Sequence, residues 1–260
     1  MKLTQKLIGA VLLLGLASFV YANKAQGHYV SRMVEKLPAF DTINVQGDID
    51  VDFMQHPTAT VHASGPQKAL ETVTVRAKNN VLEISYLPQR MTKNSGKVRV
   101  MITGPDLHEV TVNNAGDVHV RGSLNVQDLT VTLTQEGEFS ADGLTVQNLH
   151  IHAAGKSEAD INRLDAHHVQ AVADDNGDIE LAGLALTAEL QNHGTGDIDA
   201  SDLRVQTATA SVNGKGEISV SAYEKLTAAV IGKGKIKYKG SPVSLERDGN
   251  IKRIVQDTDD

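Results

Sequence analysis

Acidic side chains recur just after a series of regularly placed glycines, and clustered carboxylates can bind cations. They stand one position after a glycine at Asp117, Glu138, Asp178, Asp197 and Glu217, and three positions after one at Glu158, Glu180 and Asp199. If the repeats are in register, Asp178, Glu180, Asp197 and Asp199 form one outward patch. Such a patch could bind Ca²⁺ weakly, or a basic ligand, because hard cations prefer clustered oxygens. The alternative is a solvated face, since two charges about 5 Å apart repel by under about 1 kcal/mol in water.

Histidine is the second residue type here that could bind a metal, and the chain has 10 of them. His152, Asp174 and His193 each stand three positions before a recurring glycine. Such a column could ligate zinc or copper. The same position in other repeats is occupied by Asn113, Thr134 and Asn213. We therefore interpret the column as polar surface and assign no metal-ligating residue.

Two further patterns have counterparts in enzymes and nucleotide-binding proteins. Gly194-Thr195-Gly196 and Gly232-Lys233-Gly234 resemble parts of phosphate loops, but no helix is predicted to follow them, so they indicate turns. Solenoid enzymes that cleave polysaccharides use carboxylates with arginine or lysine in a groove. The repeats contain Arg163 and Arg204, and neither is expected to have an aromatic platform for a sugar ring. We predict a non-enzyme with no catalytic or cofactor-binding residues and no cofactor.

Composition narrows the function classes further. The 260 residues contain no cysteine, which excludes disulfides, Cys-ligated metals and a thiol nucleophile. With 4 Phe, 5 Tyr and no Trp, the chain lacks the aromatic residues that stack on bases or line a membrane barrel. The net charge of -7 argues against a nucleic-acid partner.

The glycines that order these residues define an internal repeat. A glycine followed by a polar and then usually an apolar residue recurs along most of the chain, with only small differences between the intervals. These glycines are Gly116, Gly137, Gly155, Gly177, Gly196, Gly216 and Gly234. A regular spacing of about 20 residues is typical of solenoid proteins.

Within each repeat, apolar and polar residues alternate on both sides of the glycine. Before Gly216, Val212 and Ala210 alternate with polar residues, and after it Ile218 and Val220 do the same. Each repeat therefore predicts two short strands with one buried face, bent at a glycine. Two strands in about 20 residues match one turn, or rung, of an all-β parallel β-helix (β-solenoid). An antiparallel sandwich is the alternative, but it would not explain why the same columns recur.

Two sets of residues depend directly on this register. Alternating lysines close to Pro242 are expected to protect the end of the stack from pairing with other chains, with a basic binding patch as the alternative. These lysines are Lys233, Lys235, Lys237 and Lys239. One buried aliphatic column is predicted at Ile179, Ile198, Ile218 and Ile236.

The first residues predict export. Lys2 and Lys6 precede an uncharged stretch, and Val20-Tyr21-Ala22 offers small residues to a signal peptidase. We predict a signal peptide over residues 1–22 and a tether over 23–38. An uncleaved anchor is the alternative, although the apolar stretch from Leu7 to Ala22 is shorter than the ~20 residues that a spanning helix needs.

Residues 39–255 are predicted to form a single head domain, followed by an acidic tail at 256–260. Within the head, residues 39–105 are expected to form an irregular β module that caps the regular rungs of 106–255. Its Gly47-Asp48-Ile49 resembles an early rung. Strands are expected at 59–63, 73–76, 81–86 and 98–103, with a short helix or turn at 67–71. A solenoid needs such a cap because its end rung exposes an unpaired edge.

Several segments together resemble one bacterial family of exported proteins. They are Gly104-Pro105-Asp106-Leu107, rungs such as Gly194-Thr195-Gly196-Asp197-Ile198, and the closing Ile236-Lys237-Tyr238-Lys239-Gly240-Ser241-Pro242. From about Phe40 to Ile254 the chain resembles the family called putative auto-transporter adhesin, head GIN domain. The resemblance implies a β-solenoid and, through the family name, adhesion.

We therefore predict a non-catalytic exported module of the periplasm or cell surface of a bacterium. Its expected partner is an envelope protein or a glycan, and no transmembrane segment is expected after signal cleavage. The alternative is a glycan-acting β-helix enzyme, either a lyase or a hydrolase.

Overall fold

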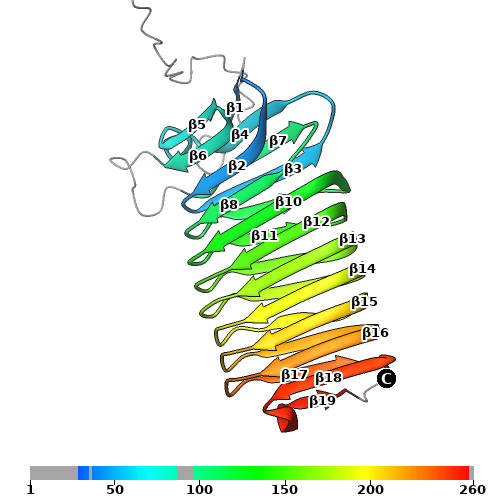
Figure 1. Cartoon of the computed structure of the whole chain (residues 1–260). Coiled ribbons are helices and arrows are strands. Elements are labelled where there is room, and N and C mark those ends of the chain that lie inside the picture. The colour runs from blue at the N-terminus through cyan, green and yellow to red at the C-terminus, as the bar shows by residue number, and fades with distance from the viewer. Residues whose placement is uncertain (1–28, 35–36, 87–95, 258–260) are drawn as a thin grey trace, which may run out of the picture.

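The computed structural model of the protein describes residues 29–34, 37–86 and 96–257 (Figure 1). The predicted signal peptide lies outside these residues. Within them, no helix combines the length and the apolar character needed to cross a membrane. Apart from the short helix α1 (Gln67–Leu70) and a 3-10 turn at Ile251–Arg253, the regular structure there is β-strand.

A stack of parallel strands forms the body of the molecule, which confirms the predicted β-solenoid (Figure 1). Each strand pairs with the strand one rung further along, as Leu129 pairs with Leu149 and Leu149 with Val169. The strands of the stack are β2 (Phe40–Gln46), β3 (Ile49–Gln55), β8 (Glu109–Asn113), β9 (Asp117–Val120), β10 (Leu124–Thr134), β11 (Glu138–Ala141), β12 (Leu144–Ala153), β13 (Glu158–Ala173), β14 (Asp178–Asn192), β15 (Ile198–Val212), β16 (Glu217–Val230), β17 (Lys235–Lys239), β18 (Ser244–Gly249) and β19 (Ile254–Gln256).

The N-terminal module closes one end of this stack. Its elements are β1 (Tyr29–Val34), β4 (Thr60–Pro66), α1, β5 (Val73–Lys78), β6 (Asn80–Tyr86) and β7 (Val98–Gly104). Strands β6 and β7 pair in parallel with β2 and β3 and so add one more rung. Antiparallel strands then end the ladder, with β5 on β6, β4 on β7 and β1 on β4. The parallel edge is therefore covered, as a solenoid end requires.

One part of the predicted tether is structured. The sequence predicts a tether over residues 23–38, but Tyr29–Val34 form strand β1. Only Val34 of this strand is buried, so its hydrophobic alternation is too weak to show in the sequence. Backbone pairing with β4 along the whole strand holds it instead.

The predicted aliphatic column is confirmed. Ile179 pairs with Ile198, Ile198 with Ile218, and Ile218 with Ile236, and all four side chains are at most 2% exposed. Strand β19 extends the column by Ile254, which pairs with Ile236. The interior of the solenoid is thus filled by aliphatic side chains stacked rung on rung, which is how a parallel stack buries its core.

One glycine of the predicted repeat lies out of register. Ser157, and not Gly155, occupies the glycine column, because the Glu158 amide donates to Gly137 O and the Asp178 amide donates to Ser157 O. Gly155 instead packs over Gln135 in the preceding turn, where its φ is +83°. With Ser157 in this column, the intervals from Gly137 to Ser157 and from Ser157 to Gly177 are equal, and the irregularity of the repeat at this rung disappears.

The lysine-rich strand is internal, which corrects its predicted place at the end of the stack. Strand β17 pairs with β16 on one side and with β19 on the other. Lys237 Nζ lies 2.6 Å from Glu217 Oε1, and Lys239 Nζ lies 3.6 Å from Asp202 Oδ1. The sequence after Pro242 does not reveal the covering rung because β18 alternates weakly, with no buried residue.

Candidate functional site

Carboxylates of successive rungs lie side by side on the short strand that follows each turn. Glu158 pairs with Asp178, and Asp160 pairs with Glu180. Ile179 is buried between Asp178 and Glu180, so the side chains on either side of it point outward. The alternation of a strand thereby places two parallel columns of charge on one surface of the stack.

These two columns are called the acidic face below. The first column contains Asp50, Asp117, Glu138, Glu158, Asp178, Asp197 and Glu217. The second column contains Asp52, Asp160, Glu180 and Asp199, with His119, Ser140 and Ser219 at the positions that carry no carboxylate.

The predicted patch of four carboxylates is brought together, but it is only part of this longer surface. Glu158 belongs to the first column and not to the column of Glu180, because Ser157 occupies the glycine position. Asp50 and Asp52 were missed, since an insertion separates β3 from β9, its neighbour in the stack. The sequence alone would also misplace Asp50, because it stands three positions after Gly47, as second-column residues do after their glycines, yet it pairs with Asp117 of the first column.

Backbone hydrogen bonds stabilise part of the first column. Asp178 Oδ1 accepts a hydrogen bond from the Asp197 amide at 2.7 Å, and Asp197 Oδ1 accepts one from the Glu217 amide at 2.7 Å. Charge-assisted bonds of this kind offset part of the repulsion between stacked carboxylates. Asp178 and Asp197 therefore also connect rungs.

Cations bracket the acidic face at both ends. At the N-terminal end, Lys97 Nζ lies 2.9 Å from Asp50 Oδ1, and Arg121 Nε lies 2.8 Å from Asp52 Oδ1. At the other end, Lys237 pairs with Glu217. The charge of the columns is therefore compensated at the ends, and its middle rungs carry the strongest negative field.

Burial, together with crowding, changes the titration of three carboxyls in the acidic face. Burial, followed by the charge of carboxylates on neighbouring rungs, raises the pKa of Asp117, Glu138 and Glu180 above the usual range. The ionised forms of these three carboxyls are thus disfavoured, and a cation bound nearby would lower the free-energy cost of ionising them.

A second cluster is centred on Asp174, which bridges two histidines. His152 Nε2 lies 2.7 Å from Asp174 Oδ2, and His193 Nδ1 lies 2.9 Å from Asp174 Oδ1. The bridge to His152 is diagonal, because His152 pairs with Val172 in the ladder. The hydrogen bond to His152, assisted by the one to His193, lowers the pKa of Asp174. In the described part of the chain, no three His, Asp or Glu side chains are arranged to hold a metal ion.

The opposite pKa shifts of two carboxyls predict opposite effects of neutralising them. Glu180→Gln is expected to stabilise the protein at pH 7 by up to about 0.5 kcal/mol, because a raised pKa means that the charge opposes folding. This gain should vanish as the pH falls through the folded pKa toward the unfolded one. Asp174→Asn should instead destabilise at pH 7, with the loss vanishing in acid below the folded pKa.

Urea unfolding of both variants between pH 3 and pH 8 would measure these differences. Changes of the same sign at pH 7 would contradict the electrostatic description of the acidic face and of the Asp174 cluster.

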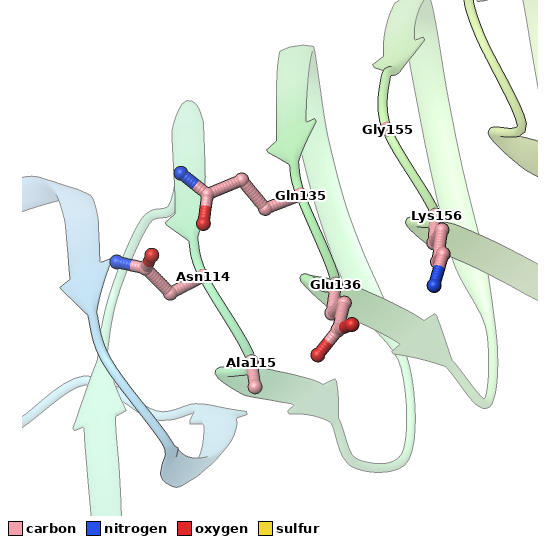
Figure 2. A pocket seen from close by; sticks show the side chains of 6 residues that line it. All are labelled: Asn114, Ala115, Gln135, Glu136, Gly155 and Lys156. Carbon is pink, nitrogen blue, oxygen red and sulfur yellow. The ribbon is translucent and has the colours of Figure 1, made fainter.

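Open hollows lie along the corner where the rungs turn. One of about 390 Å³ is lined by Asn114, Ala115, Gln135, Glu136, Gly155 and Lys156, which lie on three successive turns in Figure 2. Another hollow of about 360 Å³ is lined in part by Gly194 and Thr195, which belong to a segment that resembles part of a phosphate loop in the sequence. A strand follows each such glycine segment, so the segments are turns between strands, as predicted.

Arg204 has an aromatic partner, contrary to the expectation from the sequence. Its guanidinium carbon lies 5.9 Å from the centre of the Tyr223 ring. Arg204 belongs to β15 and Tyr223 to β16, so the contact forms only when one rung stacks on the next. The pair is a cation–π contact on the surface.

The stacked parallel rungs define the class of the protein, which is a β-solenoid built from repeats and carrying charged columns on its outer surface. The chain belongs to the family described as "Putative auto-transporter adhesin, head GIN domain", whose model matches residues 39–242. The resemblance inferred from the rung motifs is thereby confirmed.

Solved structures share this fold. A "putative lipid binding protein" from Parabacteroides distasonis ATCC 8503 has a TM-score of 0.78 at 20% identity, covering 88% of this chain and 97% of that chain. A "putative adhesin" from Parabacteroides merdae ATCC 43184 has a TM-score of 0.76 at 19% identity, covering 93% and 100%. A "putative adhesin" from Bacteroides fragilis NCTC 9343 has a TM-score of 0.65 at 26% identity, covering 88% and 94%. No curated protein sequence matches the chain.

Proposed function

We propose that the protein is a non-catalytic binding module of the bacterial cell envelope or surface, and that the acidic face contacts a cationic partner. The observation that carries this proposal is the run of like charge over successive rungs of one rigid sheet. An enzyme concentrates its functional groups in one cleft, whereas a repeated surface suits a partner that is itself extended.

The spacing of the acidic face suits such a partner. Adjacent strands lie about 4.8 Å apart, so each rung offers a carboxylate at a regular interval. Asp117, Glu138 and Glu180 are the groups whose ionised forms gain most from a nearby cation, because their pKa values are raised. Complementary charge of this kind gives specificity and fast association more than raw affinity.

The proposed location is outside the cytoplasm. The charged and then apolar residues at the N-terminus are typical of a signal peptide over residues 1–22. The family name refers to adhesion, and two of the similar solved structures are described as adhesins. In this proposal, residues 39–255 act together with strand β1 as one head domain, and residues 256–260, which begin at the last residue of β19, follow as a short acidic tail.

A set of neutralised carboxylates tests the proposal. The variant carries Glu158→Gln, Asp160→Asn, Glu180→Gln and Asp199→Asn, and it spares Asp178 and Asp197, whose carboxylates bond the amides of the next rung. Binding to a surface coated with poly-L-lysine should weaken by at least about 10-fold at low salt, because charge complementarity controls this contact. Biolayer interferometry at rising salt concentration would measure it.

The matched control removes the same charge from exposed positions outside the acidic face. It carries Asp106→Asn, Glu136→Gln, Asp165→Asn and Glu224→Gln. This control should bind nearly as the unmodified protein does. An equal loss in both variants would show that net charge, and not the acidic face, governs binding.

A further inference from the structure

Methionine and histidine side chains meet on the outer surface of the N-terminal module. Met33 on β1 pairs with His62 on β4, and His62 pairs with Met101 on β7. Directly opposed residues of antiparallel strands share one face, with Cβ atoms about 4.5–5.5 Å apart. The three side chains therefore form one row across three strands.

A fourth sulfur lies beside this row. Met101 pairs with Asp52 on β3, and Met54 follows two positions later on the same face. A hollow of about 230 Å³ is lined by Met54, His62 and Met101 together with residues of the surrounding strands. Met54 is thus a diagonal neighbour of Met101, within reach of a long side chain.

The methionines of this surface are not core residues. Met33, Met54 and Met101 are 52%, 48% and 52% exposed, and they are all the methionines within the described residues. His62 is half-buried, and its imidazole makes no hydrogen bond or ion pair with any described residue. Exposed apolar side chains gathered at one place indicate a function more often than scattered ones do.

The donor chemistry selects a soft ion. Thioether sulfur is a soft ligand that favours Cu(I), whereas Ca²⁺ and Mg²⁺ require oxygen ligands. The nearby carboxylate of Asp52 is already paired, with Arg121 Nε at 2.8 Å and Arg99 Nε at 3.7 Å. The donor set is therefore neutral and suits a monovalent soft cation better than a hard divalent one.

We propose that Met33, His62 and Met101 form a Cu(I) site on the N-terminal module, with Met54 as an additional thioether beside it. This site adjoins the acidic face at Asp52 but uses none of its carboxylates as a ligand, and the proposal does not depend on the proposed function. In a chain without cysteine, the thioethers are the sulfur ligands that a soft metal can find.

The test is an anaerobic titration of the isolated protein with Cu(I) in competition with the chelator bicinchoninate. One Cu(I) per chain is expected to be withdrawn from the chelator. The doubly substituted Met33→Leu/Met101→Leu variant should bind at least 10-fold more weakly, and so should His62→Ala. Leucine keeps the size and apolar character of methionine, so these variants should fold, which thermal unfolding would verify.

A second measurement follows the methionine methyl signals by NMR as Ag(I), a redox-inert substitute for Cu(I), is added. The signals of Met33 and Met101 should shift together and saturate at one equivalent. The control is His152→Ala, which alters the separate cluster around Asp174 and should leave Cu(I) affinity unchanged. Failure to compete with the chelator, affinity unchanged in the Leu variant, or a loss in the control instead would overturn the site.

Discussion

Replacing Gly216 with alanine is expected to destabilise the protein by on the order of 4 kcal/mol or more. Gly216 lies in the column of turn glycines, and a Cβ atom there would collide with the carbonyl oxygen of Gly196. The obstacle is backbone of the adjacent rung, which cannot move aside as a flexible side chain could. The same Cβ would come within 2.7 Å of Asn192 Nδ2, which donates a 2.6 Å hydrogen bond to Gly196 O. Thermal and urea unfolding would measure the loss.

Gly122→Ala is the control that separates collision from backbone strain. Gly122 has a φ of +75°, but nothing lies within 4 Å of the added Cβ. This substitution should lower the free energy of unfolding by only about 1–2 kcal/mol, which is the strain of an alanine in the left-handed region. A Gly216→Ala variant as stable as the Gly122→Ala variant would show that the rungs are not stacked as closely as described.

Replacing Ile198 with alanine is expected to cost about 2–4 kcal/mol. Ile198 is 1% exposed and lies between Ile179 and Ile218 in the buried column. The truncation removes apolar contacts with both neighbouring rungs and leaves a cavity, because the stacked backbones resist collapse. Chemical denaturation at neutral pH would give the free energy of unfolding.

The control for this prediction is Thr209→Ala on the outer surface of the same strand. Thr209 is exposed, between buried Ala208 and Ala210. Its replacement should change the free energy of unfolding by no more than about 0.5 kcal/mol. Similar losses from the Ile198 and Thr209 substitutions would mean that the inward and outward positions had been exchanged.

The regular rungs could be predicted because their period is visible in the sequence. The column from Ile179 to Ile236 follows from alternation and from the regular spacing of the turn glycines, and each stacked pair occurs in the structure. The one glycine that was assigned to the wrong column has a physical explanation. Ser157 is small enough for the glycine column, whereas Gly155 serves a neighbouring turn with positive φ.

The surroundings of the acidic face were harder to predict because they depend on pairings across long stretches of chain. Asp50 joins the first column only because β3 pairs with β9, although β4 to β8 all lie between them in the chain. Likewise, β19 covers the lysine-rich strand β17, but β19 is short and its sequence lacks clear alternation. The contact between Arg204 and Tyr223 was hard to predict for a similar reason, because it joins side chains of two adjacent rungs.

The row of Met33, His62 and Met101 could not be found from the sequence at all. Its three residues belong to strands joined by antiparallel pairing, outside the repeat. Met33 also falls in the segment that the sequence predicts as a tether. Only the fold of the N-terminal module brings these side chains to one face.

Carboxyl footprinting on an envelope preparation would test the proposed function most directly. Exposed carboxylates of the isolated protein are labelled with a carbodiimide and an amine, before and after the protein binds to bacterial envelopes, and are then quantified by mass spectrometry. We expect Glu158, Asp160, Glu180 and Asp199 to become protected on binding, whereas Asp106, Glu136 and Glu224 should remain as reactive as before. Protection of the second group, with the acidic face still fully labelled, would show that the protein binds the envelope through another surface.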